Sequence, residues 1–152
     1  MLRRNKVYAY IIRGEHLLVF RHVDFPKEGI QIPGGTVEEG EDPALAVLRE
    51  AFEETGLESL QKVSYLGSDE WVMLKNNDEE MHYFRYFYPL ICEPPVPDSW
   101  LHDELYPSDG SPAPITFEFY WLPVAEAASS LHPCYAASLD RLFDNLPGHP
   151  RG

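Results

Sequence analysis

The chain has 152 residues, of which 44% are hydrophobic and 24% charged, so we expect a single domain over residues 1–152 with a sizeable core. The formal net charge of −13 disfavours a nucleic acid polymer as partner, because binding a polyanion needs a basic stripe and the sequence shows none. The first apolar run, residues 7–12, is too short for a secretory signal or a membrane span. Cys92 and Cys134 form no CxxC pair, so the expected location is the reducing cytoplasm.

The chain begins with two β-rich runs. Residues 7–12 and 16–20 are separated by a short turn containing Gly14, which predicts a hairpin. Residues 30–32 alternate apolar and polar side chains, so we expect a brief strand there. This strand leads into the sequence Pro33-Gly34-Gly35.

The next element is a helix with a clear start and stop. Asp42 can cap free backbone N–H groups, and Pro43 has the φ angle of a first helical residue. Gly56 can adopt the left-handed conformation that commonly follows a helix. The sequence therefore predicts a helix over residues 43–55.

Three carboxylates share one stripe of this predicted helix. Glu50, Glu53 and Glu54 stand at positions i, i+3 and i+4, which are neighbours on a helix surface. The apolar residues of the opposite side predict the packing face: Ala44, Leu45, Leu48, Ala51 and Phe52. We therefore expect the carboxylates to point outward, into a cleft or into solvent.

Carboxylates this close together repel one another, so a counter-charge is expected. Hard oxygen ligands at this density suit Mg²⁺, with Mn²⁺ as a substitute, and both ions complete their coordination with water and substrate phosphates. The alternative is a solvated acidic helix face with no ligand. The Gly34-Gly35 turn and Arg49 favour the metal site, because a solvated face needs neither.

The segment from Gly35 to Leu57 resembles the Nudix box, G-x5-E-x7-R-E-U-x-E-E-x-G-U, in which U is an aliphatic residue. Every fixed position is present, and Ala51 stands where the family usually carries a larger aliphatic side chain. The resemblance implies hydrolysis of a nucleoside diphosphate linked to another moiety. It also implies the Nudix fold, an α/β/α sandwich with a mixed β-sheet between helices.

The resemblance also assigns roles to residues. The three carboxylates of the helical stripe and the backbone carbonyl of Gly34 would be metal ligands. Arg49 would orient a glutamate of the site, and Glu41 would have a supporting part. We favour Glu53 as the general base that takes a proton from the attacking water, although family members place the base differently, in the box or on a later glutamate.

The rest of the chain completes the sandwich. Four β-rich segments follow, at residues 63–67, 71–74, 81–91 and 115–124. The polar turn at residues 75–78 predicts a second hairpin, and residues 139–146 have apolar side chains at helical spacing. We expect helix 43–55 on one face of the sheet and the C-terminal helix on the other.

Six prolines interrupt the segment between residues 93 and 114, so we expect a Pro-rich loop at about 93–114. Loops this long are commonly lids or binding segments. Trp100 within it would either stack on a substrate base or anchor the loop to its own domain.

Several charged residues outside the box are further candidates. Glu118 lies on an apolar strand and is an additional candidate metal ligand or base. Three more acids share this status: Glu79, Glu80 and Glu104. Candidates for contact with substrate phosphates are Arg21, His22 and Lys27, although surface cations on a hairpin are ordinary.

The expected function is Mg²⁺-dependent hydrolysis of a small-molecule substrate, a nucleoside triphosphate or a dinucleoside polyphosphate. Proteins with this motif also cleave nucleotide sugars and coenzyme A, and the substrate choice lies in loops. The alternative is a catalytically silent module that keeps the fold to bind or sense a nucleotide. Such modules usually lose box carboxylates, and none is missing here.

Overall fold

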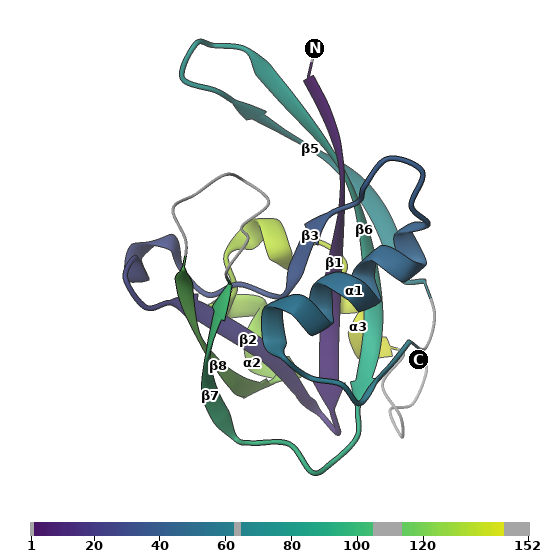
Figure 1. Ribbon diagram of the computed structural model, residues 1–152, viewed down its shortest axis with the longest axis vertical. Helices are drawn as coiled ribbons and strands as arrows, with labels where there is room; N and C mark the ends of the chain where they lie inside the picture. Colours follow the sequence, from purple (N-terminus) through teal and green to yellow (C-terminus); the bar gives the residue numbers. More distant parts are fainter. Residues whose placement is uncertain (1, 63–64, 105–113, 145–152) are drawn as a thin grey trace.

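The computed structural model describes residues 2–62, 65–104 and 114–144 (Figure 1). Its sheet has eight strands: β1 (Leu2–Arg13), β2 (His16–His22), β3 (Gly34–Thr36), β4 (Leu60–Lys62), β5 (Gly67–Leu74), β6 (Glu80–Cys92), β7 (Ser99–Glu104) and β8 (Ile115–Pro123). The helices are α1 (Pro43–Thr55), α2 (Val124–Ser130) and α3 (Leu139–Asp144), with short 3-10 turns at Pro26–Glu28 and Pro133–Tyr135.

The sheet divides into two parts that meet at β1. Strand β1 pairs in parallel with β6 along nearly its whole length, with Tyr8 opposite Phe87. Its other edge pairs with β2 only at the hairpin end, because the middle of that edge pairs with β3, where Val7 lies opposite Gly35. Strand β2 continues instead to β8 and then β7. The two parts therefore diverge, and Figure 1 shows β2, β8 and β7 spreading away from β1 and β6.

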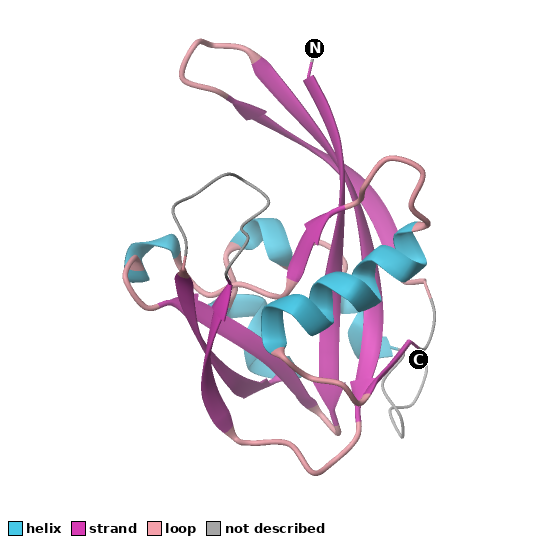
Figure 2. Ribbon diagram, in the orientation of Figure 1, coloured by secondary structure: helices cyan, strands magenta, loops and turns pink. Residues whose placement is uncertain are grey.

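Helices cover both faces of the sheet (Figure 2). Helix α1 crosses one face and buries Ala46, Val47 and Ala51 in a core shared with the sheet. Helices α2 and α3 cover the opposite face, where Leu139 and Leu142 join a second core. The α/β/α sandwich predicted from the sequence is confirmed. Within the described residues, no helix is both long enough and apolar enough to cross a bilayer.

Both predicted hairpins are confirmed. Gly14, with a φ of 63°, lies between β1 and β2, and a bond of 2.9 Å from Lys75 N–H to Glu79 O closes the turn between β5 and β6. The strand predicted at residues 30–32 is wrong in position, because Ile30 and Gln31 form only isolated bridges and the strand is β3. A Gly-Gly sequence has no alternation of side chains that could have marked it.

Two other predicted elements extend beyond the described residues. Helix α3 is described to Asp144, and residues 145–146 of the predicted helix lie outside the described ranges. Residues 63–64 of the strand predicted at 63–67 also lie outside them, and β5 begins at Gly67.

Helix α1 has the predicted bounds and the predicted ends. The Asp42 carboxylate accepts from Ala44 N–H, and Gly56 takes the left-handed conformation with a φ of 78°. The predicted packing face is wrong in part, because Leu45 is 63% exposed and Phe52 48% exposed. The helix packs instead through its small residues and through Glu50 and Glu54, which are buried.

The predicted loop at 93–114 contains a strand. Residues Ser99–Glu104 form β7, which pairs antiparallel with β8 and places Trp100 opposite Phe119. The prolines stand on either side of this run and none lies within it, so the backbone N–H groups needed for the ladder are available. Residues 105–113 of the predicted loop lie outside the described residues.

Substitution of Gly56 tests the end of α1. Gly56→Ala forces a side chain into the left-handed conformation, at a cost of about 1–2 kcal/mol, and its Cβ would lie 3.1 Å from His102 Cε1. Gly40→Ala is the matched control, because Gly40 has the same φ of 78° with open space around its Cβ. Urea unfolding should show a larger loss of stability for Gly56→Ala. Equal losses of stability in the two variants would mean that the His102 side chain moves aside at no cost in free energy.

Candidate active site

The side chains of Glu50 and Glu54 tie α1 to the glycine turn. Gly34 N–H donates to Glu54 Oε2 at 3.1 Å, and each of the two glutamates is only 6% exposed. Gly35 permits this approach, because a Cβ there would lie 2.1 Å from Glu50 Cδ. The helix and the turn therefore pack through the carboxylates themselves.

The Gly34 carbonyl points away from β1. Ala9 N–H donates to Pro33 O at 2.8 Å, so in this antiparallel ladder the next residue, Gly34, turns its polar groups to the other side. The N–H and C=O of one strand residue share a side, and the Gly34 N–H reaches Glu54. The Gly34 carbonyl thus faces the same side as the buried carboxylate, as a metal ligand would require.

Arg49 lies at the centre of the outer acids. Its guanidinium donates to Glu41 at 2.8 and 2.9 Å, to Glu50 at 2.9 Å and to Glu53 at 3.3 Å. It also donates to the Thr36 carbonyl at 3.2 Å, which anchors it to β3. The structure therefore brings together the residues to which the Nudix resemblance gave orienting and supporting roles.

The acids of the site differ strongly in environment. Burial raises the pKa of Glu54 well above its ordinary value, and the nearby charge of Glu104 raises it further. Burial also raises the pKa of Glu50, against the opposing charge of Arg49. The hydrogen bond from Arg49 lowers the pKa of Glu41 to about 2. Such separation of carboxylate pKa values is typical of functional sites.

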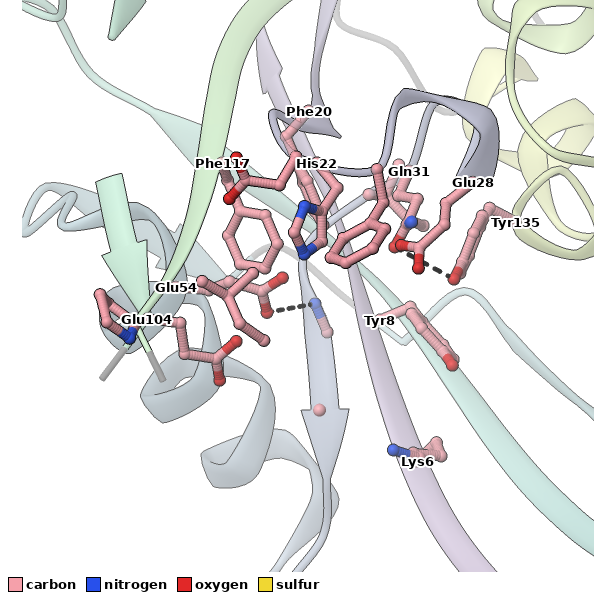
Figure 3. Close-up of a pocket in the computed structure, with 17 residues that line it drawn as sticks. Lys6, Tyr8, Phe20, His22, Glu28, Gln31, Glu54, Glu104, Phe117 and Tyr135 are labelled. Atoms are coloured by element: carbon pink, nitrogen blue, oxygen red, sulfur yellow. Dashed lines mark hydrogen bonds between the residues drawn. The ribbon is translucent and has the colours of Figure 1, made fainter. Parts of the chain in front are cut away.

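A cavity of about 510 Å³ opens beside Glu54, between the diverging parts of the sheet (Figure 3). Rings from several elements line it, among them Tyr8, Phe117 and Tyr135. Glu54 and Glu104 lie together at one end, and Lys6 of β1 is the one Lys or Arg side chain among the described lining residues. The cavity has the size and the mixture of rings and polar groups of a small-molecule site.

His22 is a buried polar group of this cavity. It is 8% exposed, and its Nδ1 has no hydrogen-bond partner among the described residues. Its ring makes edge contacts with Phe25 at 4.7 Å and Phe117 at 5.7 Å between centroids. A buried polar atom without a partner is unfavourable, so a ligand in the cavity that bonded to it would gain affinity.

Of the four candidate acids outside the box, Glu104 is the one among the described residues that line the cavity, where Asp24 and Glu28 also lie. Glu104 also raises the pKa of Glu54 through its charge. Glu79 and Glu80 lie at the start of β6, where they contact Asn77 and His82.

The remaining candidates lie apart from the box carboxylates. Glu118 pairs with Arg21 at 2.5 Å, on the face of β8 opposite to that of Phe117. Phe117 belongs to the core beneath α1, so Glu118 faces the α2 side. Lys27 is exposed on the 3-10 turn and is not among the cavity-lining residues described. These positions favour no metal contact for Glu118 and no phosphate contact for Arg21 or Lys27.

Trp100 anchors its strand. Its indole N–H donates to the Thr55 carbonyl at 2.9 Å, and its ring stacks on Phe119 at 5.2 Å between centroids. Of the two roles considered for this residue, these contacts support anchoring. Trp100 is not among the described residues that line the cavity.

The carboxylate and carbonyl oxygens of the site are ligands that suit a hard divalent cation, but the carboxylate side chains do not converge on one point. In the described part of the chain, no three His, Cys, Asp or Glu side chains converge closely enough to hold a metal ion. Arg49 contacts both Glu50 and Glu53, while Glu54 bonds the Gly34 N–H. Two buried carboxylates and an outward backbone carbonyl are still the oxygen set that Mg²⁺ prefers.

Comparison with known proteins fixes the family. The model of the NUDIX domain matches residues 2–146. The chain belongs to the Nudix family. A search of the curated proteins found no match.

Several solved structures, one of them named as a NUDIX hydrolase, share the fold. The MutT NUDIX hydrolase from Burkholderia pseudomallei is 19% identical with a TM-score of 0.58, and the match covers 93% of this chain and 99% of that one. The E. coli ORF135 protein is 21% identical with a TM-score of 0.60 and coverages of 100% and 96%. The C. elegans Ap4A hydrolase is 17% identical with a TM-score of 0.58 and coverages of 97% and 100%.

Membership settles the general chemistry. Nudix hydrolases cleave pyrophosphate bonds and generally use a divalent metal ion, so this chain is a Nudix pyrophosphohydrolase. Several cavity residues had escaped the sequence reasoning, among them Lys6, Tyr8 and Phe117. They come from strands distant in sequence, and no local pattern marks them.

Glu54→Gln should stabilise the metal-free protein. Gln keeps an oxygen for Gly34 N–H while removing a charge that burial and Glu104 disfavour. In excess chelator at pH 7, Tm should rise by roughly 2–4 °C. For a chain of this size, that rise corresponds to about 1 kcal/mol in the free energy of unfolding. Because only the ionised carboxylate is disfavoured, the gain should vanish below pH 4.5, the ordinary pKa of a glutamate.

The exposed Glu58 supplies the control for this measurement. Glu58→Gln should leave Tm unchanged at both pH values. A lower Tm for Glu54→Gln at pH 7 would contradict the assignment of Glu54 as an unfavourably buried charge.

Proposed function

We propose that the chain is a Mg²⁺-dependent hydrolase that cleaves the diphosphate bond of a nucleoside triphosphate or a dinucleoside polyphosphate. One observation carries the proposal: the box keeps all of its carboxylates, and one of them, Glu54, lines a ring-lined cavity and bonds the glycine turn. A silent sensor would have no use for an unfavourably buried carboxylate next to a second acid.

Four groups of this chain would hold the metal: the carboxylates of Glu50, Glu53 and Glu54 and the carbonyl of Gly34. Glu50 would give up its contact with Arg49, which keeps its two bonds to Glu41 and its bond to Glu53 Oε2. A bound Mg²⁺ supplies charge neutralisation for the diphosphate and a lower pKa for a bound water. Mn²⁺ has similar ligand preferences and should substitute.

Glu53 is our proposed general base. It is the exposed member of the three, so its carboxylate can reach a water that attacks from solvent. Arg49, 3.3 Å from Glu53 Oε2, would orient it, and Glu41 would hold Arg49 in place. As the proton passes to Glu53, the water oxygen would bond to phosphorus and the bridging P–O bond would break, so that the bridging oxygen leaves with the other phosphate.

The distribution of cavity side chains supports one orientation of the substrate. Lys6 and Glu54 would face the phosphates, while the rings of Phe25 and Phe117 and the buried His22 would face a planar base. An aromatic ring stacks on any base, and His22 offers a polar group for its edge. The naming of one structural neighbour as an Ap4A hydrolase and another as MutT is consistent with nucleotide substrates.

The chain would function as a single domain in the cytoplasm. Residues 1–152 would act as one domain, because one sheet joins elements from both ends of the described chain. Both cysteines are free thiols, which suits a reducing cytoplasm.

Metal removal is the first test. Phosphate or pyrophosphate release from a nucleotide panel should stop in excess chelator and return on addition of Mg²⁺ or Mn²⁺. The panel should contain the ribonucleoside and deoxyribonucleoside triphosphates and a series of dinucleoside polyphosphates. Full turnover in excess chelator would refute the proposed site and mechanism together.

The second test separates the enzyme from the sensor. Glu53→Gln and Glu54→Gln should each lower kcat by at least about 100-fold, because each removes a ligand or base while keeping side-chain volume. Glu58→Gln is again the control and should keep wild-type kcat. Nucleotide binding by the wild type without turnover on any panel member would favour the sensor instead.

A further inference from the structure

Strand β7 presents one face to helix α1. Exposure alternates along the strand, so Trp100, His102 and Glu104 share the less exposed side. Trp100 reaches α1 while its ring lies on Phe119 of β8, which fixes the indole plane. Glu104, at the end of the same face, lines the cavity beside Glu54.

Two of these side chains form hydrogen bonds with backbone carbonyls at the C-terminal end of α1. The last carbonyls of an α-helix have no partner within the helix. In α1, Trp100 Nε1 donates to Thr55 O at 2.9 Å, and His102 Nε2 lies 3.0 Å from Glu53 O. A carbonyl oxygen can only accept, so His102 is the donor and its Nε2 carries the hydrogen.

These bonds act on the turn that carries two of the proposed ligands. Glu53 itself supplies one of the carbonyls, and Glu54 precedes Thr55, which supplies the other. Helix ends fray when their carbonyls are unsatisfied, and a frayed last turn would swing both carboxylates. The groups that orient metal ligands typically change metal affinity or activity by about 10–100-fold when they are removed.

We propose that Trp100 and His102 are positioning residues, which hold the last turn of α1 so that Glu53 and Glu54 meet the metal in register with Gly34. The inference rests on the proposed function, because it assigns these side chains to the geometry of that site. It also gives β7 a part in the phosphorus chemistry, beyond any part in substrate choice.

The test removes each bond while keeping the shape. Trp100→Phe keeps a ring to lie on Phe119 but has no N–H, and His102→Leu has no donor. His102→Gln restores an N–H at a similar reach. Trp121→Phe is the matched control, because the Trp121 indole N–H donates to Pro97 O at 3.0 Å and bonds no residue of α1.

Three quantities are measured for each variant: Mn²⁺ binding without substrate, kcat and KM on the best nucleotide, and hydrogen exchange of the amides at the end of α1. Trp100→Phe and His102→Leu should weaken Mn²⁺ binding and lower kcat by about 10-fold or more, with KM within a few-fold. Both should speed amide exchange in the last turn. His102→Gln should have nearly wild-type Mn²⁺ binding, kcat and amide exchange, and Trp121→Phe should match the wild type.

Each outcome decides between the two proposals. Wild-type protein that neither binds Mn²⁺ nor turns over any nucleotide sinks the proposed function, and amide exchange still reports whether the two side chains hold the turn. Wild-type protein that is active, with both variants indistinguishable from Trp121→Phe in Mn²⁺ binding, sinks the positioning role. If Trp100→Phe does not fold, the comparison of His102→Leu with His102→Gln decides alone.

Discussion

A carboxylate buried against a backbone N–H holds the centre of this molecule together. Glu54 reaches from α1 to Gly34, and this contact joins the helix, the glycine turn and the wall of the cavity. It requires a turn without side chains, since Glu50 lies where a Cβ on Gly35 would be. Burying a carboxylate without a cation in contact is unfavourable. The fold thus holds a buried carboxylate that a bound cation would stabilise.

A second buried charged side chain shows how the protein pairs a charge that has no part in ligand binding. Arg85 is 2% exposed and bonds Asp69 through two nitrogens, both at 2.7 Å, and it also donates to the Cys134 carbonyl. Its charge and its donors are satisfied by the protein itself, as buried ion pairs require. Glu54 has a backbone donor, but burial and the charge of Glu104 outweigh the opposing charge of Lys6 and raise its pKa. The contrast supports a structural role for Arg85 and a functional one for Glu54.

Local signals in the sequence were enough for α1 and the two hairpins, while β7 and the site depended on long-range contacts that such signals do not encode. Asp42, Pro43 and Gly56 mark the ends of α1 because capping acts within a few residues. The buried face of α1 was misassigned, because hydrophobic periodicity cannot foresee that carboxylates will be covered by a turn while Leu45 stays exposed. Strand β7 was hidden by flanking prolines and is defined by pairing with β8. Glu104 reaches the cavity through that same long-range pairing, so it could be named only as one acid among several.

The sheet keeps the two hydrophobic cores apart, and this has a bearing on how the molecule tolerates change. One core lies beneath α1, while the other lies beneath α2 and α3, contains Leu139 and Leu142, and reaches the cavity through Ile32. Packing free energy is additive for groups that share no contacts. Sequence drift or engineering on the α2 and α3 side can therefore adjust thermal robustness while leaving the carboxylate helix in place. The α2 and α3 side thus offers a reserve of stability apart from the carboxylates of α1, with Ile32 and Tyr135 as its connection to the cavity wall.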